Sequence, residues 1–296
     1  MATMRVAVLG PGSVGGLIAA VLARKGVPVT CIASDSSAQE IAKVGLSVIS
    51  ERFGTFSIPI HAANRLNEPV DVLAVTVKST SLDDAISRVP SNVLGTAMVV
   101  PLLNGVEHVA LLRQRLPNAY VIPATIRIET ARTAPTIIEQ RSPFAAIEIA
   151  RGHRGDHRVA DFAQTLGEIG FDVTIRDDEK EMLWEKLAIL APFALLTTIY
   201  SAPAGIIRSR HRPELEEVAG EIALVAGAED VTIDPSSILA FFDRVPASMK
   251  SSMQLDDEAK RPLEIEAIGG AVLRSASTHA VPVPTIERLV SELRNR

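Results

Sequence analysis

The sequence predicts an α/β fold in which a doubly wound, parallel sheet is followed by an all-helical C-terminal domain. Three observations lead to this prediction. Short apolar segments alternate with helical segments as far as Leu116, a glycine-rich turn lies within the first pair, and beyond Lys180 the apolar periodicity is helical only. The polar stretch Asp177–Lys180 marks the boundary, which predicts one domain over residues 1–176 and a second over 177–296.

The N-terminal elements follow one another as strand–helix pairs. Arg5–Leu9 is almost entirely apolar, as parallel strands buried on both faces are, and a helix over Ser13–Lys25 ends at Gly26, a favourable C-terminal cap. Further strands are predicted at Val27–Ala33, Val70–Lys78 and Met98–Leu102, and further helices at Ala38–Val44, Leu82–Arg88 and Glu107–Leu116. Alternation at this spacing predicts right-handed crossovers between parallel strands.

The pattern changes between Ala119 and Ile149. Helical stretches fade, and β-branched segments such as Thr136–Ile138 and Ala146–Ile149 predict a mixed or antiparallel edge to the sheet. A helix over Asp156–Ile169 and a strand over Phe171–Ile175 complete this domain. The C-terminal helices are predicted at Lys180–Thr198, Arg212–Gly227, Ser236–Arg244 and Leu263–His279.

The glycine-rich turn is the strongest local motif. Gly10, Gly12 and Gly15 form a GxGxxG pattern between the first strand and the first helix. The first glycine permits a tight turn, the second lets the backbone approach a pyrophosphate, and the third lets the helix pack against the sheet. The helix start, with Ser13 and Val14, offers amide groups to the phosphates. The motif predicts a Rossmann-type domain that binds NAD or NADP.

The residues after the second strand bear on which nucleotide is bound. Asp35 lies twenty residues after Gly15, where a carboxylate would accept a hydrogen bond from a free ribose 2′-hydroxyl and disfavour the 2′-phosphate of NADP. Ser34, Ser36 and Ser37 favour the opposite choice, because hydroxyl groups can donate to a phosphate. These residues alone leave both nucleotides open.

Composition excludes several other classes of function. The formal net charge of −5 without a basic cluster makes a nucleic-acid partner unexpected. Cys31 is the only cysteine, so no intrachain disulfide can form and a reducing, cytoplasmic location is expected. The most apolar stretch, Leu187–Tyr200, is shorter than a membrane span, and no membrane association is expected. His153 and His157 have a metal-like spacing, but the turn between them predicts no metal site.

Several further motifs fall in a recognisable order. Val77-Lys78-Ser79, Leu103-Asn104-Gly105 and Trp184-Glu-Lys186-Leu187 follow the glycine turn, and Ser251-Ser252-Met253 precedes Glu264, which lies twelve residues after Ser252. In this order and spacing, nearly the whole chain resembles the ketopantoate reductase (2-dehydropantoate 2-reductase) family. The resemblance implies a helical domain after the Rossmann domain and an interdomain cleft in which NADPH reduces a 2-keto acid. It also implies a place in pantothenate biosynthesis.

The resemblance also implies roles for individual residues. Lys186 matches the family's catalytic lysine, Glu264 the acidic residue that orients the substrate, and Ser252 a substrate-contacting serine. Lys78 and Asn104 match cofactor-side residues. Ser34 stands where some members carry an arginine for the 2′-phosphate, so the resemblance implies NADP while NAD stays open. From the residues alone, Lys186 could be a lysine at a helix edge and Glu264 a helix-starting charge.

The chain departs from the family pattern at three positions. Leu190 and Ala194 lie one and two helical turns after Lys186 on the same face, and Met249 precedes Ser252 by three residues. Typical family members carry asparagine at these positions to bind polar groups of the substrate. Loss of such hydrogen-bonding partners changes selectivity strongly. We therefore expect Leu190 and Ala194 to line the site of a bulkier or more apolar 2-keto acid than ketopantoate.

Two alternatives remain at this point. The β-hydroxyacid dehydrogenases share the domain order and a helix-borne lysine, but they usually carry glycines ahead of the lysine, and Glu181–Lys186 has none. A nucleotide-binding module with a degenerate active site would explain the three lost asparagines, although it would not explain the retention of Lys186 with Glu264. The expected partner is a small-molecule substrate, and the helical domain could support a homodimer.

Overall fold

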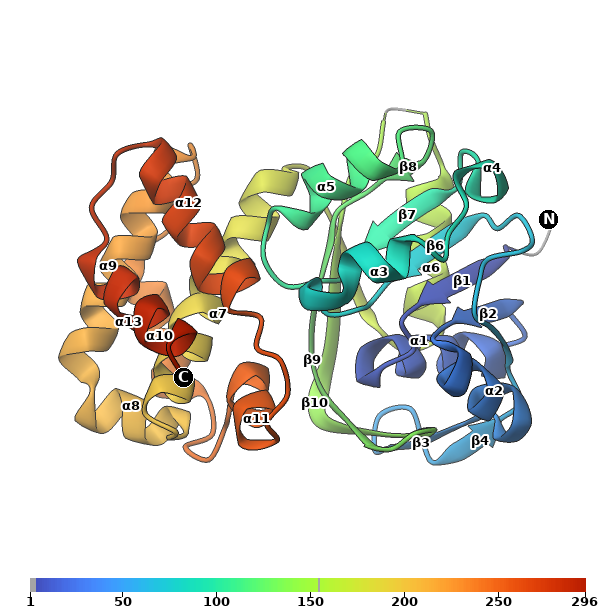
Figure 1. Cartoon of the computed structure of the whole chain (residues 1–296), viewed down its shortest axis with the longest axis horizontal. Coiled ribbons are helices and arrows are strands. Elements are labelled where there is room, and N and C mark those ends of the chain that lie inside the picture. Colours follow the sequence, from blue (N-terminus) through green and yellow to red (C-terminus); the bar gives the residue numbers. More distant parts are fainter. Residues whose placement is uncertain (1–3, 154) are drawn as a thin grey trace. The chain divides into compact units, whose positions relative to one another are not determined.

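The computed structural model describes residues 4–153 and 155–296. The chain divides into two compact units (Figure 1). Unit 1 comprises Met1–Leu103 and His108–Glu179, and unit 2 comprises Asn104–Glu107 and Lys180–Arg296. The division near residue 180 lies three residues from the predicted boundary, whereas the assignment of Asn104–Glu107 to unit 2 has no counterpart in the sequence prediction.

Unit 1 is built on a six-stranded parallel sheet in the order β5-β2-β1-β6-β7-β8. Its strands are β1 (Val6–Leu9), β2 (Val29–Ile32), β5 (His61–Ala63), β6 (Val72–Val75), β7 (Met98–Pro101) and β8 (Tyr120–Val121). The chain winds outward from β1 to β5 on one side and from β6 to β8 on the other. The strand order therefore reverses between β1 and β6, which is where doubly wound sheets bind their ligands.

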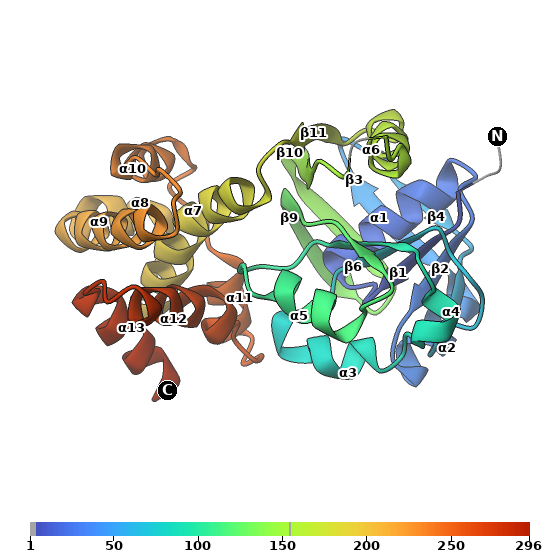
Figure 2. The ribbon, with the colours of Figure 1, turned by 90° about the horizontal axis from the view of Figure 1, so that it is seen from above.

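The connections between these strands are mainly helical. The helices of unit 1 are α1 (Ser13–Arg24), α2 (Asp35–Val44), α3 (Leu82–Ile86), α4 (Ser91–Leu94), α5 (His108–Arg115) and α6 (Arg158–Glu168), and a 3₁₀ turn spans Ser79–Ser81. Figure 2 shows α3 and α5 on one side of the six-stranded sheet and α1 on the other. The predicted Rossmann-type fold is thus confirmed.

A second sheet in unit 1 corrects one prediction. The segment 119–149, expected at an edge of the first sheet, instead mainly supplies β9 (Ala124–Ala134) and β10 (Ile137–Ala150) to a separate five-stranded sheet. The order there is β11-β10-β3-β4, with β9 antiparallel to β10, and the remaining strands are β3 (Leu46–Ser50), β4 (Phe56–Ile58) and β11 (Asp172–Arg176).

Helix α1 explains why a second sheet is needed. Its residues from Gly15 to Leu22 are all buried, although a helix against one sheet normally leaves a solvated face. The second face is covered by the five-stranded sheet, and a Cβ atom at Gly16 would lie 2.5 Å from Ile138 Cδ1 of β10. An apolar helix of this kind lies between two layers of sheet.

Unit 2 contains no strand among residues 180–296, all of which are described. Its helices are α7 (Glu179–Ile199), α8 (Ala204–Arg210), α9 (Arg212–Ala228), α10 (Pro235–Arg244), α11 (Ser252–Glu258), α12 (Ala271–Thr278) and α13 (Pro284–Arg294). Figure 2 shows α7 between α8–α10 and α12–α13, and α7 supplies core residues from Trp184 to Ile199. The predicted all-helical C-terminal domain is confirmed, although the sequence prediction lacked α8, α11 and α13.

The helix predicted over Leu263–His279 begins later than expected. It starts after Glu264 with a π-helical turn, Glu266–Gly270, and continues as α12. A Cβ atom at Gly269 would lie 2.5 Å from Val290 Cγ2, so a glycine is needed for the close packing of this turn on α13. Single π-helical turns are rare and often mark functional sites.

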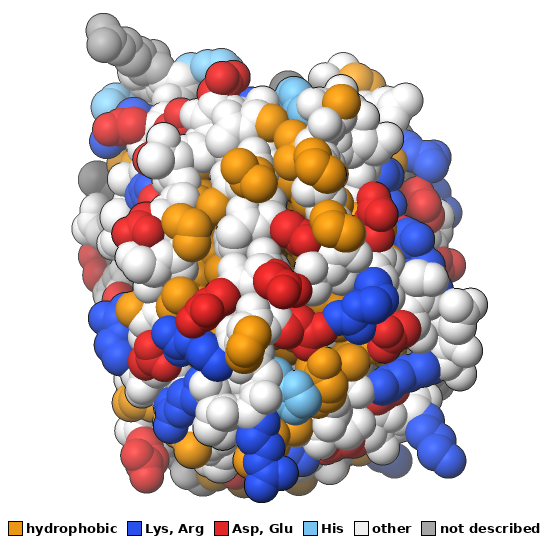
Figure 3. Space-filling model, turned by 90° about the vertical axis from the view of Figure 1, so that its left-hand side faces the viewer, with side chains coloured by type: hydrophobic (Ala, Val, Ile, Leu, Met, Phe, Trp, Pro, Cys, Tyr) orange, Lys and Arg blue, Asp and Glu red, His pale blue; other side chains and the backbone are white. Residues whose placement is uncertain are grey.

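Helix α7 is long and apolar enough, by length and composition, to cross a membrane. However, 72% of its most apolar window is buried inside the structure, as in a core helix, so its composition is weak evidence for a membrane span. Figure 3 shows one face of unit 2, on which hydrophobic side chains lie among acidic and basic ones. Leu224 of α9 is the most exposed large hydrophobic residue of this unit, at 61%.

Candidate active site

The glycine turn follows β1 at the point where the strand order reverses. Gly10 has a φ of +84°, and a Cβ atom there would lie 2.3 Å from Val77 Cγ1. At Gly15 a Cβ atom would lie 2.1 Å from Thr76 Oγ1 and 2.6 Å from the carbonyl oxygen of Gly10. The Thr76 hydroxyl donates to that carbonyl at 2.8 Å. The protein's own packing therefore requires both glycines.

Gly12 differs from these two neighbours. Its φ of −74° suits any residue, and a Cβ atom there would meet only the Gly10 carbonyl oxygen, at 3.9 Å. The fold itself therefore does not require a glycine at this position. Gly12 precedes Ser13 and Val14 in the first turn of α1, where backbone amides of any helix lack intrahelical acceptors. Open space beside a helix N-terminus fits the pyrophosphate of a dinucleotide.

The end of β2 carries the residues that would meet the adenosine ribose. Ser34 is the exposed N-cap residue of α2, and Asp35 is its first helical residue. The Asn64 side-chain amide donates to the Asp35 carboxylate at 2.5 Å. Arg88, which follows α3, donates through Nη1 to the carbonyl oxygens of Ala33 and Asn64, each at 3.4 Å. A guanidinium group thus lies beside the residues that precede Ser34.

Cys31 lies on the same strand. Its side chain is fully buried, and burial raises the pKa of its thiol to about 12. A thiol with so high a pKa remains protonated and is a poor nucleophile. Cys31 therefore acts as a small core residue, as its place in an apolar strand predicts.

In unit 2, Lys186 lies on α7, beside Glu185, and is half-buried where the buried, apolar part of this helix begins. Leu190, one turn further on, is also half-buried and packs against the core, whereas Ala194 is completely buried. Met249 likewise packs against the core, and Ser252 is the exposed first residue of α11. The residue before it, Ser251, is the N-cap of α11.

Glu264 is one of the buried acidic residues of unit 2. Its side chain belongs to a residue only 7% exposed, and its backbone carbonyl accepts the Ile268 amide at 3.1 Å at the start of the helical turns. The Asn104 side-chain amide donates to the Glu264 carboxylate at 3.0 Å. Two residues predicted separately, one on the cofactor side and one catalytic, are therefore direct partners within unit 2.

Comparison with known proteins identifies the family. The family model of ketopantoate reductase PanE/ApbA matches residues 6–153, and the model of its C-terminal domain matches residues 178–296. The chain belongs to the ketopantoate reductase family. It is thus an NAD(P)-dependent oxidoreductase that reduces a 2-keto acid, and the expectation drawn from its motifs is confirmed at this level. The same match removes the β-hydroxyacid dehydrogenases as the family.

Similar proteins cover the whole chain. The 2-dehydropantoate 2-reductase of Halobacterium salinarum is 30% identical over 98% of this chain and 98% of its own length. The crystal structure of a PanE/ApbA family ketopantoate reductase from Ralstonia eutropha JMP134 has a TM-score of 0.89 at 26% identity, covering 98% of this chain and 97% of the other. The ternary structure of D-mandelate dehydrogenase with NADH and anilino(oxo)acetate has a TM-score of 0.88 at 20% identity, covering 97% and 96%, and shares the fold.

Some residues of this ketopantoate reductase family member were not predicted from its sequence. Asn64 contacts Asp35 after β2, and Arg88 contacts Asn64. Arg274 contacts Glu107, which lies three residues after Asn104. A single arginine after a short helix, or a glutamate after an Asn-Gly pair, carries no motif in a single sequence. Lys78, which was predicted, lies three residues after the end of β6 as the N-cap residue of the 3₁₀ turn and is half-buried.

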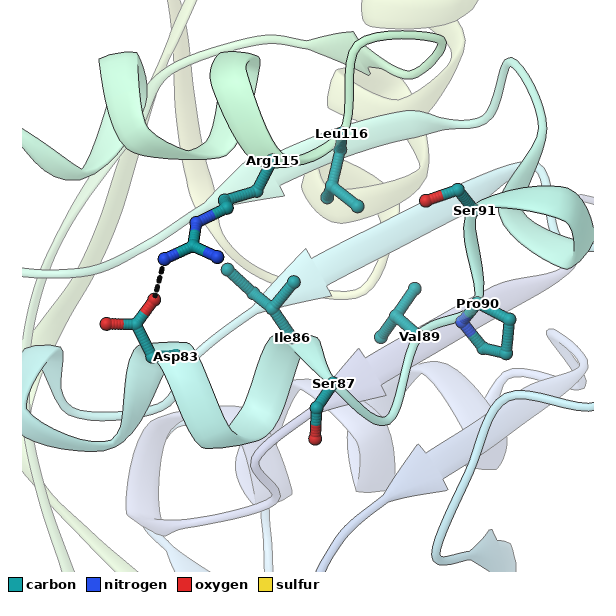
Figure 4. A pocket seen from close by; sticks show the side chains of 8 residues that line it. All are labelled: Asp83, Ile86, Ser87, Val89, Pro90, Ser91, Arg115 and Leu116. Atoms are coloured by element: carbon teal, nitrogen blue, oxygen red, sulfur yellow. Dashed lines mark hydrogen bonds and ion pairs between the residues drawn. The ribbon is translucent and has the colours of Figure 1, made fainter.

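A separate hollow in unit 1 is shown in Figure 4. It is lined by Asp83, Ile86, Ser87, Val89, Pro90, Ser91, Arg115 and Leu116. An exposed ion pair joins Arg115 to Asp83 at 3.0 Å on its rim. None of the predicted site residues lines this hollow, and it does not enter the proposals below.

Proposed function

We propose that this reductase takes a 2-keto acid with an apolar side chain and prefers NADPH as its hydride donor. Unit 1 would bind the nucleotide at Gly12, Ser13 and Val14, and unit 2 would act on the substrate through Lys186, Glu264 and Ser252. The buried Glu264 carboxylate, which accepts the Asn104 amide at 3.0 Å in the unit that carries Lys186, is the observation that carries this proposal.

Reduction of a ketone needs a hydride and a proton. Bound NADPH supplies the hydride, and the proton must reach the oxygen on which negative charge develops. Lys186 would donate this proton from its ammonium group and would stabilise the developing alkoxide before the transfer is complete. Its half-buried position next to the buried Leu187 supports this role, because electrostatic interactions strengthen where water is excluded.

Glu264 and Ser252 would position the substrate. A carboxylate accepts hydrogen bonds only, so Glu264 would accept one from the hydroxyl group that forms as the ketone is reduced. A carboxylate has about four acceptor positions, so the hydrogen bond from the Asn104 amide does not by itself exclude a second one from the substrate. The exposed Ser252 hydroxyl can donate to the substrate carboxylate. Together these groups would fix the plane of the keto acid.

The apolar side-chain preference rests on Leu190, Ala194 and Met249. Leu190 lies one turn from Lys186 and is half-buried, so a substrate beside the lysine would contact carbon rather than an amide. Ala194 is buried and would act by leaving space rather than by contact. A hydroxylated keto acid such as ketopantoate would lose its hydrogen-bonding partners on this wall, whereas an aliphatic or aromatic keto acid would bury apolar surface there.

The preference for NADPH is supported by Arg88. Ser34 cannot neutralise a 2′-phosphate, but the Arg88 guanidinium lies 3.4 Å from the carbonyl oxygen of the residue before it. Arginine binds phosphate through charge-assisted hydrogen bonds. The Asp35 carboxylate, which would oppose a phosphate, accepts the Asn64 amide. We also propose a cytoplasmic location. The homodimer remains a prediction, which light scattering would test.

The test is a steady-state survey of the purified protein. A panel of 2-keto acids with aliphatic, aromatic and hydroxylated side chains would be assayed with NADPH and with NADH. The proposal predicts higher kcat/KM for apolar keto acids than for ketopantoate, and for NADPH than for NADH. Efficient turnover of ketopantoate would contradict the substrate preference, and absence of turnover on every member would favour a binding module with a degenerate active site.

A further inference from the structure

We propose that Arg274 is a positioning residue for Glu264. By anchoring the segment Asn104–Glu107 to unit 2, it holds the Asn104 amide against the Glu264 carboxylate. The inference rests on the proposed reductase function, in which Glu264 positions the substrate. It deepens that function by naming residues remote from the substrate on which the geometry depends.

The segment Asn104–Glu107 has an unusual place in the fold. It follows β7 and precedes α5, both of which belong to unit 1, yet its four residues belong to unit 2. The segment forms no helix or strand that would fix its conformation. Its position must therefore come from contacts with the rest of unit 2.

Arg274 of α12 makes several of these contacts. It donates to the Glu107 carboxylate through Nε and Nη2, each at 2.7 Å, in a bidentate arrangement. Its Nη1 and Nη2 also donate to the Glu266 carboxylate and backbone carbonyl, at 3.0 and 2.6 Å. The hydrogen bonds to Glu107 are the main reason that the pKa of Arg274 is raised above its ordinary value. One guanidinium thus joins the segment to the π-helical turn.

Gly105 brings the segment directly onto this turn. Its φ is +86°, and a Cβ atom there would lie 2.3 Å from the carbonyl oxygen of Ala267. Only glycine permits such an approach. The π-helical turn begins two residues after Glu264, so the segment and the carboxylate are fixed to the same short stretch of backbone.

The hydrogen bond between Asn104 and Glu264 completes the arrangement. A carboxylate in a residue only 7% exposed requires a donor, because an unsatisfied buried charge is costly. The donor here lies at one end of the segment and the ion pair at the other, three residues away. A shift of the segment by about one ångström would turn the amide from the carboxylate, and displacements of that size can cost up to about a hundredfold in rate.

Arg294 provides a matched control. It donates to the same Glu266 carboxylate through Nε at 2.7 Å and Nη2 at 2.9 Å, and its side chain is as exposed as that of Arg274, at 46% against 47%. Among the described residues, Glu266 is the only carboxylate to which Arg294 donates. If Arg274 merely stabilised the π-helical turn, loss of either arginine would have the same effect. If it positions Asn104, only the loss of Arg274 will matter for turnover.

The experiment compares Arg274→Met with Arg294→Met in the full chain. We expect Arg274→Met to lower kcat/KM for the best 2-keto acid by about tenfold or more, with the NADPH dissociation constant within about twofold of the parent. Arg294→Met should stay within about twofold in both quantities. Arg274→Lys, which keeps the charge but loses the bidentate geometry, should recover part of the loss. Thermal unfolding verifies that each variant folds.

A double variant tests the coupling. Glu107→Gln and Arg274→Met break the same ion pair, so the double variant should lose little more than either single variant. Equal losses for Arg274→Met and Arg294→Met, or fully additive losses for the double variant, would overturn the proposal. If the parent reduces no 2-keto acid, the proposed function fails, and hydrogen–deuterium exchange then decides the positioning. Faster exchange over 104–107 in Arg274→Met, but not in Arg294→Met, supports anchoring, and unchanged exchange overturns it.

Discussion

The side-chain amide of Asn104 donates to the Glu264 carboxylate at 3.0 Å, although 160 positions separate the two residues in the sequence. Asn104 comes from the turn after a strand of the nucleotide-binding sheet, and Glu264 from the start of a π-helical turn. Their contact joins two motifs that the sequence offers only as separate signals. It also places a buried, hydrogen-bonded carboxylate in the unit that carries the lysine.

The three glycines of the turn should separate into two classes. Gly12→Ala meets no atom closer than 3.9 Å, so the variant should unfold at the parent's temperature. Its NADPH dissociation constant should nevertheless rise by roughly tenfold or more, because the methyl group would occupy space needed by the pyrophosphate. Gly15→Ala should lower the Tm by several degrees, since its Cβ would lie 2.6 Å from a backbone oxygen. A Gly12→Ala variant with normal NADPH affinity would contradict the proposal that the pyrophosphate lies beside Gly12.

Arg88 should determine the preference between nucleotides. Arg88→Met is expected to weaken binding of NADPH and of 2′,5′-ADP by roughly tenfold to a hundredfold, the range for a charge-assisted hydrogen bond to phosphate. Binding of NADH and of 5′-AMP should change little. Titration calorimetry measures all four ligands, and Arg115→Met, which removes an exposed ion pair elsewhere in unit 1, is the control. Equal losses for phosphorylated and unphosphorylated ligands would show that Arg88 acts on the fold instead.

Leu190 should set part of the substrate preference. Leu190→Asn would restore the amide that ketopantoate reductases commonly carry at this position, one turn after Lys186. The ratio of kcat/KM for ketopantoate to that for an aliphatic keto acid should rise by roughly tenfold, because a buried amide left without a partner penalises the apolar substrate. Leu190→Met, of similar volume and polarity, is the matched control and should leave the ratio unchanged. A ratio unaffected by asparagine would place Leu190 away from the substrate.

Glu148 should link the stability of unit 1 to pH. Its side chain is 13% exposed and accepts from Arg127 at 2.6 Å and Arg176 at 2.8 Å. Burial raises the pKa of this carboxyl, but the two arginines together outweigh burial and hold it below the usual value. A lowered pKa in the folded state stabilises the fold above the unfolded-state pKa, roughly 4.3, and this contribution is lost as the pH falls through the folded-state pKa.

Glu148→Gln should therefore be less stable than the parent by roughly 1–3 kcal/mol at pH 7. The difference should shrink as the pH falls below about 4, where the parent carboxyl also becomes protonated. Urea unfolding at a series of pH values measures it. Glu139→Gln, which removes a more exposed carboxylate from the same strand, should show little change. A difference that is constant with pH would mean that the carboxylate's charge is not what stabilises unit 1.

The parts of the fold that could be predicted from the sequence are those with a strong local pattern. The strands β1, β6 and β7 are continuous apolar runs, and β2 is interrupted only by Thr30. The glycine turn lies between a strand and a helix, so these elements could be predicted. The strands β3, β4 and β5 have three to five residues each, and β3 alternates between buried and exposed positions, so their signal is weak. The separate sheet follows from the burial of α1 on both sides, which no single segment reveals.

In the candidate site, too, only the residues that belong to recognisable motifs could be predicted. Gly12 lies in a motif of fixed spacing and was predicted from it, whereas Lys186 and Glu264 were predicted from the family resemblance. Arg88 and Arg274 reach their places through turns that bring distant segments together, and their neighbours in the sequence carry no motif. The contacts of Asn104–Glu107 with unit 2, namely the Asn104–Glu264 hydrogen bond, the approach of Gly105 to Ala267 and the Arg274–Glu107 ion pair, are visible only in three dimensions.

The central claim is that Lys186 of unit 2 is the general acid in the reduction of a 2-keto acid. The most direct test is the turnover of Lys186→Met, measured together with its affinity for NADPH. The account predicts a fall in kcat of about a hundredfold to ten-thousandfold, the range for loss of a general acid, with the NADPH dissociation constant unchanged. A variant that retains parental kcat with the preferred keto acid would contradict the account.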